Sequence, residues 1–342
     1  MRFLLWSLRF VLRLALSLIL LGLVAWTFGA LYYDMPFLNR ATAWLWLGSA
    51  ATMLLFIRQP WRKSLFIGLA FVGVLSWWLK LQPQANREWQ PEVAQLPWAE
   101  VAGDEVTIHN VRNFDYRTTT DFTPAWETRK VRLSQLTGID LFINYWGSPW
   151  MAHPIASFQF KDAPPICFSI ETRKEVGEKY SAIGGFYRQY ELIYIAADER
   201  DIVRLRTNYR TGEDSYLYRI PVSPERARER FMEYVATMNG LRDQPRWYNA
   251  ATTNCTTAIR TQRPNSKRAP WDWRILVNGK GDEMLYERNA LVTDGLPFPE
   301  LREKAHINSA AQAADKSPDF SKLIREGRPG FGPTPAGNAA AP

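Results

Sequence analysis

The chain of 342 residues carries a net charge of +8 and has the average hydropathy of a soluble protein. It has no block of Lys and Arg and no aromatic-basic module, which argues against a nucleic-acid-binding protein. Its three histidines and two cysteines have no zinc-site spacing, and no P-loop, GxSxG or dinucleotide motif occurs. We therefore predict neither a metal nor an organic cofactor.

Hydropathy divides the chain into two parts. Residues 1–81 are mostly apolar, whereas the remainder has the composition of a globular domain. Three apolar segments, at about 14–33, 41–57 and 64–80, predict three transmembrane helices, since about 20 apolar residues cross a bilayer. A cleaved signal peptide is the alternative for the first segment, but its apolar run is long and two more follow.

Basic residues predict the orientation. Three arginines precede residue 14, and the loop RQPWRK at 58–63 carries three more basic residues, whereas the loop between the first two segments has only Asp34 and Arg40. The positive-inside rule places the N-terminus and the 58–63 loop in the cytoplasm and everything after Lys80 outside it.

The remainder predicts a mixed α+β domain. Residues 82–104 are polar and contain prolines, which indicates a linker. Short strand-like runs then begin at Val106, Ile139, Ile155, Ile166, Glu191, Ile202 and Ser215. Turn-rich segments separate them and favour antiparallel pairing. A helix capped by Ser223 and a shorter one from about Asn254 follow, giving an α+β domain over 105–310. Residues 311–342 are rich in Ala, Pro and Gly and predict a disordered tail.

Cys255 is the first candidate for chemistry. It lies in ATTNCTTAIR, where a cap-rich TTN precedes a segment that can be helical. A cysteine at a helix N-terminus faces unpaired N–H groups, which favour its thiolate and can hold an oxyanion. Cys167, within ICFSI, has the surroundings of a core residue. A disulfide between the two cysteines is the rival interpretation.

His153 and Glu171 are the partners that the sequence offers. His153 opens the strand-like run IASFQF, where a histidine can act as base toward a thiol. Glu171 ends the run ICFSIE and can orient that histidine as a third member. A lone histidine is more often structural, and a charged loop is more often solvated. His109 and His306 have no such setting.

Five segments carry a family resemblance: HPIASFQF, SIETRKEVGEKYS, ELIYIAADERDIVRLRTNYR, YLYRI and WYNAATTNCTTAIR, in that order. Over about residues 105–265 they resemble the Lnb N-terminal periplasmic domain family. The resemblance implies a circularly permuted papain-like fold of the NlpC type, in which the histidine precedes the cysteine. It also implies that Cys255 is the nucleophile, since NCTT is similar to the NC motif of lecithin:retinol acyltransferase, and that His153 is the base. The implied role of Glu171 is weaker, because its motif is not matched.

The family's link to bacterial lipoprotein N-acylation implies a function and a location. We expect an inner-membrane cysteine acyltransferase that moves an acyl chain from phospholipid through a Cys255 thioester to an amine, such as a lipoprotein N-terminus. The same pair of residues would also suit a cell-wall peptidase or amidase, or a lipid deacylase. A non-catalytic envelope binding domain is expected instead if His153 and Cys255 lie far apart.

Overall fold

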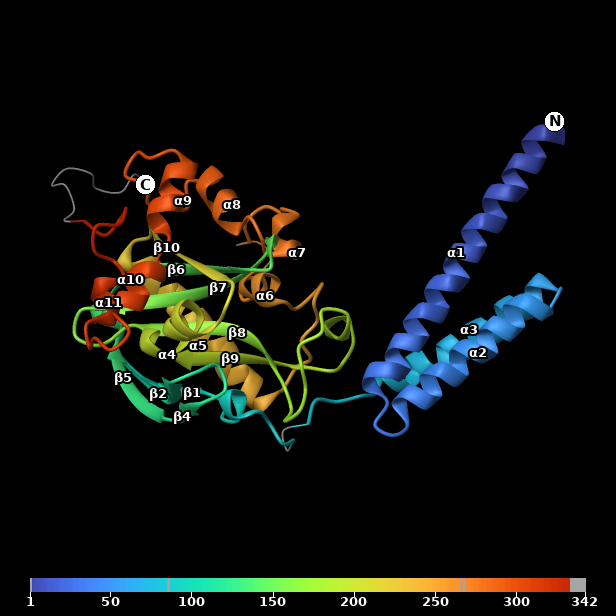
Figure 1. Ribbon diagram of the computed structural model, residues 1–342, viewed down its shortest axis with the longest axis horizontal. Helices are drawn as coiled ribbons and strands as arrows, with labels where there is room; N and C mark the ends of the chain where they lie inside the picture. The colour runs from blue at the N-terminus through green and yellow to red at the C-terminus, as the bar shows by residue number, and fades with distance from the viewer. Residues whose placement is uncertain (1, 85–86, 265, 267, 333–342) are drawn as a thin grey trace. The chain divides into compact units, whose positions relative to one another are not determined.

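Two compact units make up the chain in the computed structural model, which describes residues 2–84, 87–264, 266 and 268–332 (Figure 1). One unit contains the N-terminal helices together with residues 179–191 and 246–250. The other contains the sheet and all the candidate site residues.

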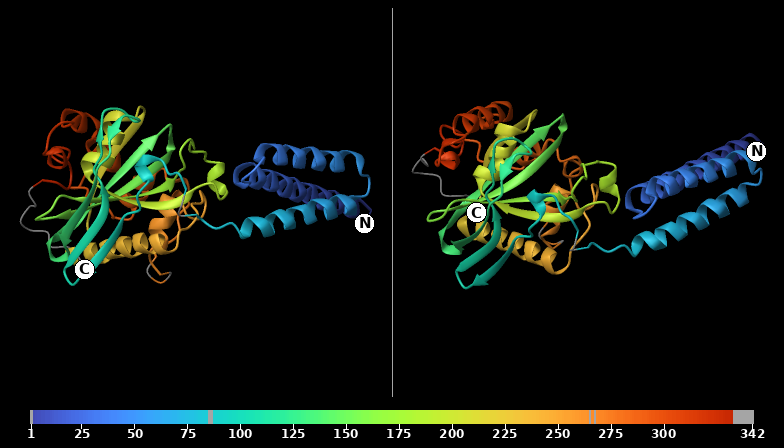
Figure 2. Two further views of the ribbon diagram at one scale, coloured as in Figure 1. Left: turned by 90° about the horizontal axis from the view of Figure 1, so that it is seen from below. Right: turned by 60° about the horizontal axis from the view of Figure 1, so that its bottom comes forward.

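The N-terminal helices are α1 (Arg2–Asp34), α2 (Asn39–Phe56) and α3 (Pro60–Leu79), and Figure 2 shows them side by side. Buried side chains of Val24, Trp46, Ala50 and Ile67 pack them together. The indole Nε1 of Trp46 also donates to the Val24 carbonyl at 3.1 Å. Many of their large apolar side chains stay exposed, as expected of helices that face lipid.

Two of the three predicted transmembrane helices are candidates for crossing a membrane in the structure. Among the described residues, Leu5–Asp34 and Pro60–Leu79 are long and apolar enough to cross a membrane. α2 forms close to its predicted bounds but does not reach that apolarity. Its 18 residues begin with Asn39 and Arg40 and include several Ala, Thr, Ser and Gly residues in place of large apolar ones.

An eight-stranded sheet organises the second unit. The strand order is β1-β2-β9-β8-β7-β6-β10, with β5 paired to β2. The strands are β1 (Trp98–Ala102), β2 (Glu105–Arg112), β5 (Trp126–Arg132), β6 (Leu136–Trp146), β7 (Ser148–Phe160), β8 (Ile166–Arg173), β9 (Glu191–Ala197) and β10 (Glu213–Ile220), and a separate hairpin joins β3 (Asp115–Tyr116) to β4 (Phe122–Thr123). The predicted antiparallel pairing is confirmed, for example between Ile155 of β7 and Ser169 of β8. One pairing, β2 with β9, is parallel.

Helices cover both faces of this sheet. Adjacent strand residues point to opposite faces, so Cys167 and Phe168 of β8 contribute to different cores. The Cys167 core packs against α4 (Glu199–Arg204), α10 (Asn308–Ala313) and α11 (Phe320–Leu323). On the Phe168 side, Phe231 and Tyr234 of α5 (Pro224–Asp243) pack their rings on Phe168 at 5.9 and 5.3 Å. The remaining α-helices are α6 (Cys255–Thr261), α7 (Arg274–Val277), α8 (Gly281–Glu287) and α9 (Phe298–Ala305).

The predicted α+β class is confirmed, but the strand predicted from Ile202 is wrong, because Ile202 lies in α4 and a π-helical turn (Leu205–Tyr209) follows it. Two predicted boundaries are also wrong. The linker assigned to 82–104 contains β1, which pairs with β2. The tail assigned to 311–342 contains α11, and Ala311, Phe320 and Ile324 are buried in the Cys167 core. Alanine is common both in disordered segments and in closely packed cores. Composition alone therefore gave the wrong prediction for residues 311–332. Residues 333–342 lie outside the described residues.

The C-terminal segment is also fixed by buried charges. Arg325 Nε lies 2.9 Å from Asp140 Oδ2, and its Nη2 lies 2.5 Å from Glu199 Oε1. Burial alone would raise the pKa of Glu199, but Arg325 outweighs burial and lowers it. Burial raises the pKa of Asp140 despite its arginine partners. Two buried carboxylates therefore share the Arg325 guanidinium, and Asp140 pairs with Arg219 as well.

We predict that Arg325→Ala destabilises the second unit by about 3–5 kcal/mol, because it leaves buried charge without its partner. Unfolding of the detergent-solubilised chain, followed by tryptophan fluorescence, measures the change. Arg117→Ala is the control, since Arg117 pairs with Asp121 on the exposed surface and its loss should matter little. Equal stability of the two variants would contradict the prediction.

Candidate active site

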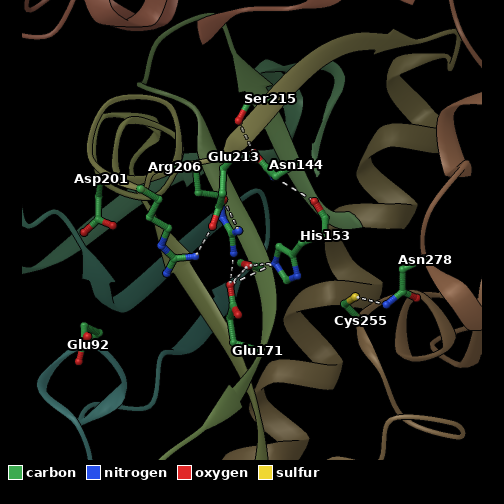
Figure 3. Close-up of polar contacts among 12 residues, drawn as sticks. Glu92, Asn144, His153, Glu171, Asp201, Arg206, Glu213, Ser215, Cys255 and Asn278 are labelled. Carbon is green, nitrogen blue, oxygen red and sulfur yellow. Dashed lines mark hydrogen bonds and ion pairs between the residues drawn. The ribbon is translucent and has the colours of Figure 1, made fainter. Parts of the chain in front are cut away.

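His153 lies on β7 and is buried, with its ring turned toward β8. Continuing the β7–β8 register from Ile155 and Ser169 by two residues brings His153 opposite Glu171. Ser169 and Glu171 are two residues apart on one strand and so share a face. The ring Nε2 lies 2.6 Å from Ser169 Oγ and 3.1 Å from Glu171 Oε1 (Figure 3).

These contacts determine which ring nitrogen carries the proton. The Ser169 hydroxyl donates to Glu171 Oε1 at 2.8 Å, so its oxygen is left to accept. An ionised carboxylate only accepts. Both neighbours of Nε2 are therefore acceptors, which places the proton on Nε2 and leaves the lone pair of the neutral ring on Nδ1.

Arg206 holds Glu171 from the other side. Its Nη2 lies 3.0 Å from Glu171 Oε1, and its Nη1 lies 3.0 Å from Glu213 Oε2. Burial would raise the pKa of Glu171, but His153 and Arg206 outweigh it and hold that pKa well below its usual range. Burial lowers the pKa of His153, and the attraction of Glu171 offsets this only in part. The site at neutral pH thus combines an ionised Glu171 with a neutral imidazole.

Cys255 is the first residue of α6, as the sequence predicted for a helix starting there. Asn254 caps this helix by accepting from the backbone N–H groups of Thr256 (3.1 Å) and Thr257 (2.8 Å). The Thr257 hydroxyl accepts in return from the Asn254 N–H at 2.8 Å, which completes a capping box. The N–H of Cys255 has no acceptor within the helix, because it lies in the first turn.

The expected stabilisation of a Cys255 thiolate is not what the structure shows. Burial, reinforced by the Glu171 carboxylate, raises the pKa of Cys255 to about 12. The N–H groups at the start of α6 lower it only in part. The Cys255 sulfur accepts a hydrogen bond from Asn278 Nδ2 at 3.3 Å. At rest Cys255 is therefore a protonated thiol.

The elements that carry the predicted residues are packed together. α6 contacts both β7 and β8. In the view of Figure 3 the His153 ring lies between the Glu171 carboxylate and the Cys255 sulfur. The structure thus joins His153 to Glu171 directly and places Cys255 on an adjacent element. Within the described residues no hydrogen bond links the sulfur to His153, whose pairing with Cys255 stays a prediction.

The other histidines and cysteine have structural surroundings. His109 stacks on Trp98 with ring centroids 4.0 Å apart, and His306 Nε2 lies 3.0 Å from Asp214 Oδ1. Cys167 is buried, and both cysteines are free, so the disulfide interpretation is wrong. In the described part of the chain no group of three or more His, Cys, Asp or Glu residues could hold a metal.

Sequence reasoning did not find Ser169, Arg206, Glu213 or Asn278. The alternation of Ser169 with Glu171 on one strand was a usable signal, because it places both on the face of His153. Arg206 and Asn278 reach the site only through the tertiary fold, and no local pattern marks them.

A buried histidine oriented by a carboxylate, next to a cysteine that begins a helix, is an arrangement found in thiol enzymes. Residues 122–279 match the family model described as the Lnb N-terminal periplasmic domain. This match confirms the resemblance found in the sequence and includes His153, Glu171 and Cys255. The comparisons with curated proteins and with solved structures gave no match. The domain family and the apolar helices together indicate a membrane protein with a periplasmic domain.

A neutral resting thiol predicts the pH dependence of its alkylation. Only the thiolate reacts, so the rate of iodoacetamide modification of Cys255 should rise about tenfold per pH unit from pH 6 to 9, without a plateau. Mass spectrometry of the Cys255 peptide from a Cys167→Ala chain measures this rate. In the same chain unfolded in denaturant the rate should begin to level off near pH 8.5 and reach a plateau above about pH 9.5. A folded-state plateau at acidic pH would instead reveal a preformed thiolate and contradict the prediction.

Proposed function

We propose that this protein is a membrane-anchored cysteine acyltransferase that moves an acyl chain from phospholipid to an amine, such as the N-terminus of a lipoprotein. The observation that carries the proposal is the Glu171–Ser169–His153 cluster, which leaves the Nδ1 lone pair free on a neutral, buried ring. Cys255 supplies the only thiol of the site, at the start of a helix that contacts both strands of the cluster.

In the first half-reaction His153 Nδ1 takes the Cys255 proton while the sulfur attacks an ester carbonyl of the phospholipid. The new S–C bond gives a tetrahedral oxyanion. Its collapse breaks the ester C–O bond, and the imidazolium returns the proton to the leaving alkoxide. The products are a lysophospholipid and a thioester on Cys255.

In the second half-reaction an amine attacks the thioester carbonyl and His153 accepts the amine proton. Collapse of this second oxyanion breaks the S–C bond, forms an amide and restores the Cys255 thiol with that proton. Arg206 supports both steps as a positioning residue, because it keeps Glu171 ionised and so stabilises the transient imidazolium.

Two donors are suited to the oxyanion. One is the backbone N–H of Cys255, which the helix leaves unpaired. The other is Asn278 Nδ2, which already lies 3.3 Å from the sulfur and therefore near the atom to which the reacting carbonyl would bond. An amide side chain in this role typically contributes about 100–1,000-fold to the rate.

For the membrane part, we propose that Arg9, Arg13 and the loop at 58–63 lie on the cytoplasmic side of the inner membrane. α2 then returns the chain between α1 and α3. Its modest apolarity suits a helix whose Trp46 and Ala50 pack against its neighbours instead of facing lipid.

The central prediction is an acyl-enzyme. The full chain incubated with phospholipid should gain one fatty-acyl mass on Cys255, detected by mass spectrometry and released by hydroxylamine. Cys255→Ala should gain none. His153→Ala should lose at least about 100-fold in the rate of acylation, and Asn278→Ala about 100-fold or more. Cys167→Ala is the matched control and should acylate normally.

The acceptor decides between transfer and hydrolysis. Transfer predicts that an amine peptide raises the release of the acyl group as amide, whereas a deacylase would release free fatty acid whether or not the amine is present. No acyl group on Cys255, together with normal folding of the chain, would refute the proposal. Cleavage of cell-wall peptides would then favour the peptidase, and inactivity on both substrates the binding domain.

The orientation predicts the outcome of reporter fusions. Fusions after Lys80 should be active only in the periplasm, and fusions near Arg62 only in the cytoplasm. A fusion at Pro36 should report the periplasm if α2 crosses the membrane as proposed. A cytoplasmic signal from residue 100 would overturn this topology.

A further inference from the structure

Six exposed apolar side chains gather where α7 meets the start of β7. We call this group the α7 surface; it comprises Trp150, Met151, Trp271, Trp273, Leu276 and Val277. The rings of Trp150 and Trp273 lie 5.8 Å apart. The Gly279 N–H donates to the Trp150 carbonyl at 3.1 Å, and a side chain at Gly279 would collide with the Trp150 backbone. The two segments are therefore held against each other as one surface.

Basic residues surround these side chains. From 260 to 280 the sequence has six basic residues and one acidic residue, Asp272. The Arg260 guanidinium lies 5.7 Å from the centre of the Trp271 ring, and Lys280 Nζ lies 4.8 Å from that of Trp150. Arg274 is neutralised by Asp272 and Glu287. Arg263 pairs with Glu233, and Lys280 Nζ lies 3.6 Å from Glu283 Oε2. Arg260 forms no ion pair within the described residues, so its positive charge remains next to the exposed ring of Trp271.

Hydrogen bonds join the α7 surface to the start of α6. The Leu276 carbonyl accepts from Asn254 Nδ2 at 3.3 Å, and the Ile275 carbonyl accepts from Thr256 Oγ1 at 3.0 Å. Asn254 and Thr256 flank Cys255. Asn278, the residue after α7, donates to the Cys255 sulfur (Figure 3). A ligand bound to the α7 surface is therefore held by a segment that hydrogen-bonds to both immediate neighbours of Cys255.

We propose that the α7 surface docks on the surface of an anionic phospholipid bilayer, with its tryptophans at the depth of the headgroups. Tryptophan prefers the membrane interface, because its ring is apolar and its N–H is polar. Lys and Arg beside such rings are attracted to anionic lipids. The excess positive charge selects this occupant over a second apolar protein surface. Presentation of a lipid ester to Cys255 rests on the proposed function, whereas docking itself needs no catalysis.

The test uses the full chain reconstituted in lipid nanodiscs, with Cys167→Ala and Cys255→Ala removing the native thiols. Trp271→Cys carries an NBD fluorophore, and Val101→Cys on β1 is the matched control, because both side chains are about half exposed (56% and 47%). We expect blue-shifted NBD emission at position 271, with about half or more of it quenched by lipids brominated on their acyl chains. Emission at 101 should resemble that in water.

Charge dependence is the second measurement. Quenching at position 271 should increase with the fraction of phosphatidylglycerol and decrease with salt, and Arg260→Gln with Lys280→Gln should abolish this dependence. A water-like signal at 271 would overturn the proposal, and so would a blue shift without quenching by brominated lipid, which indicates cover by protein. The labelled chain lacks Cys255 and therefore measures docking alone. Docking can fail while the wild-type chain still forms its thioester, and docking can succeed while no thioester forms.

Discussion

A carboxylate that must stay ionised inside the protein is the constraint on which this site depends. Arg206 keeps Glu171 ionised by pairing with it through Nη2. The Nη1 of Arg206 pairs in turn with Glu213. Arg206 lies in a π-helical turn (Leu205–Tyr209) that follows α4, a type of turn that is frequent at functional sites. With Glu171 charged and Ser169 donating to it, the proton of His153 is confined to Nε2.

Much of this arrangement was predictable because it is local. Alternating apolar residues predicted β7 and β8, and the cap-rich residues before Cys255 predicted the start of α6. His153 and Glu171 were found because each lies at an end of an apolar run. The ion pair between them follows from the register of two neighbouring strands, which a hairpin-like connection makes easy to anticipate.

The remainder depended on contacts between distant segments. Arg206 lies in a π-helical turn and Asn278 follows a short helix, and nothing near them in the sequence marks them as site residues. The alanine-rich stretch around Ala311 looked disordered, yet it fills space beside β8, where a larger side chain would not fit as closely. The acidity of Cys255 was misjudged, because helix-end electrostatics is a short-range effect worth about 0.3–1 kcal/mol when exposed, and burial outweighs it here.

The protonated state of Cys255 also bears on survival in the periplasm, a compartment whose oxidants convert exposed thiolates to disulfides and sulfenic acids. Oxidation by peroxide and disulfide exchange both require the thiolate. Disulfide exchange also requires access to the sulfur. Burial raises the pKa of Cys255 to about 12 and places its sulfur beside Asn278, so the site offers neither a thiolate nor ready access to the sulfur. The thiol is thereby stored in its reduced form without a disulfide partner, and under the proposed mechanism it becomes reactive only when a bound ester and His153 take part in the same step.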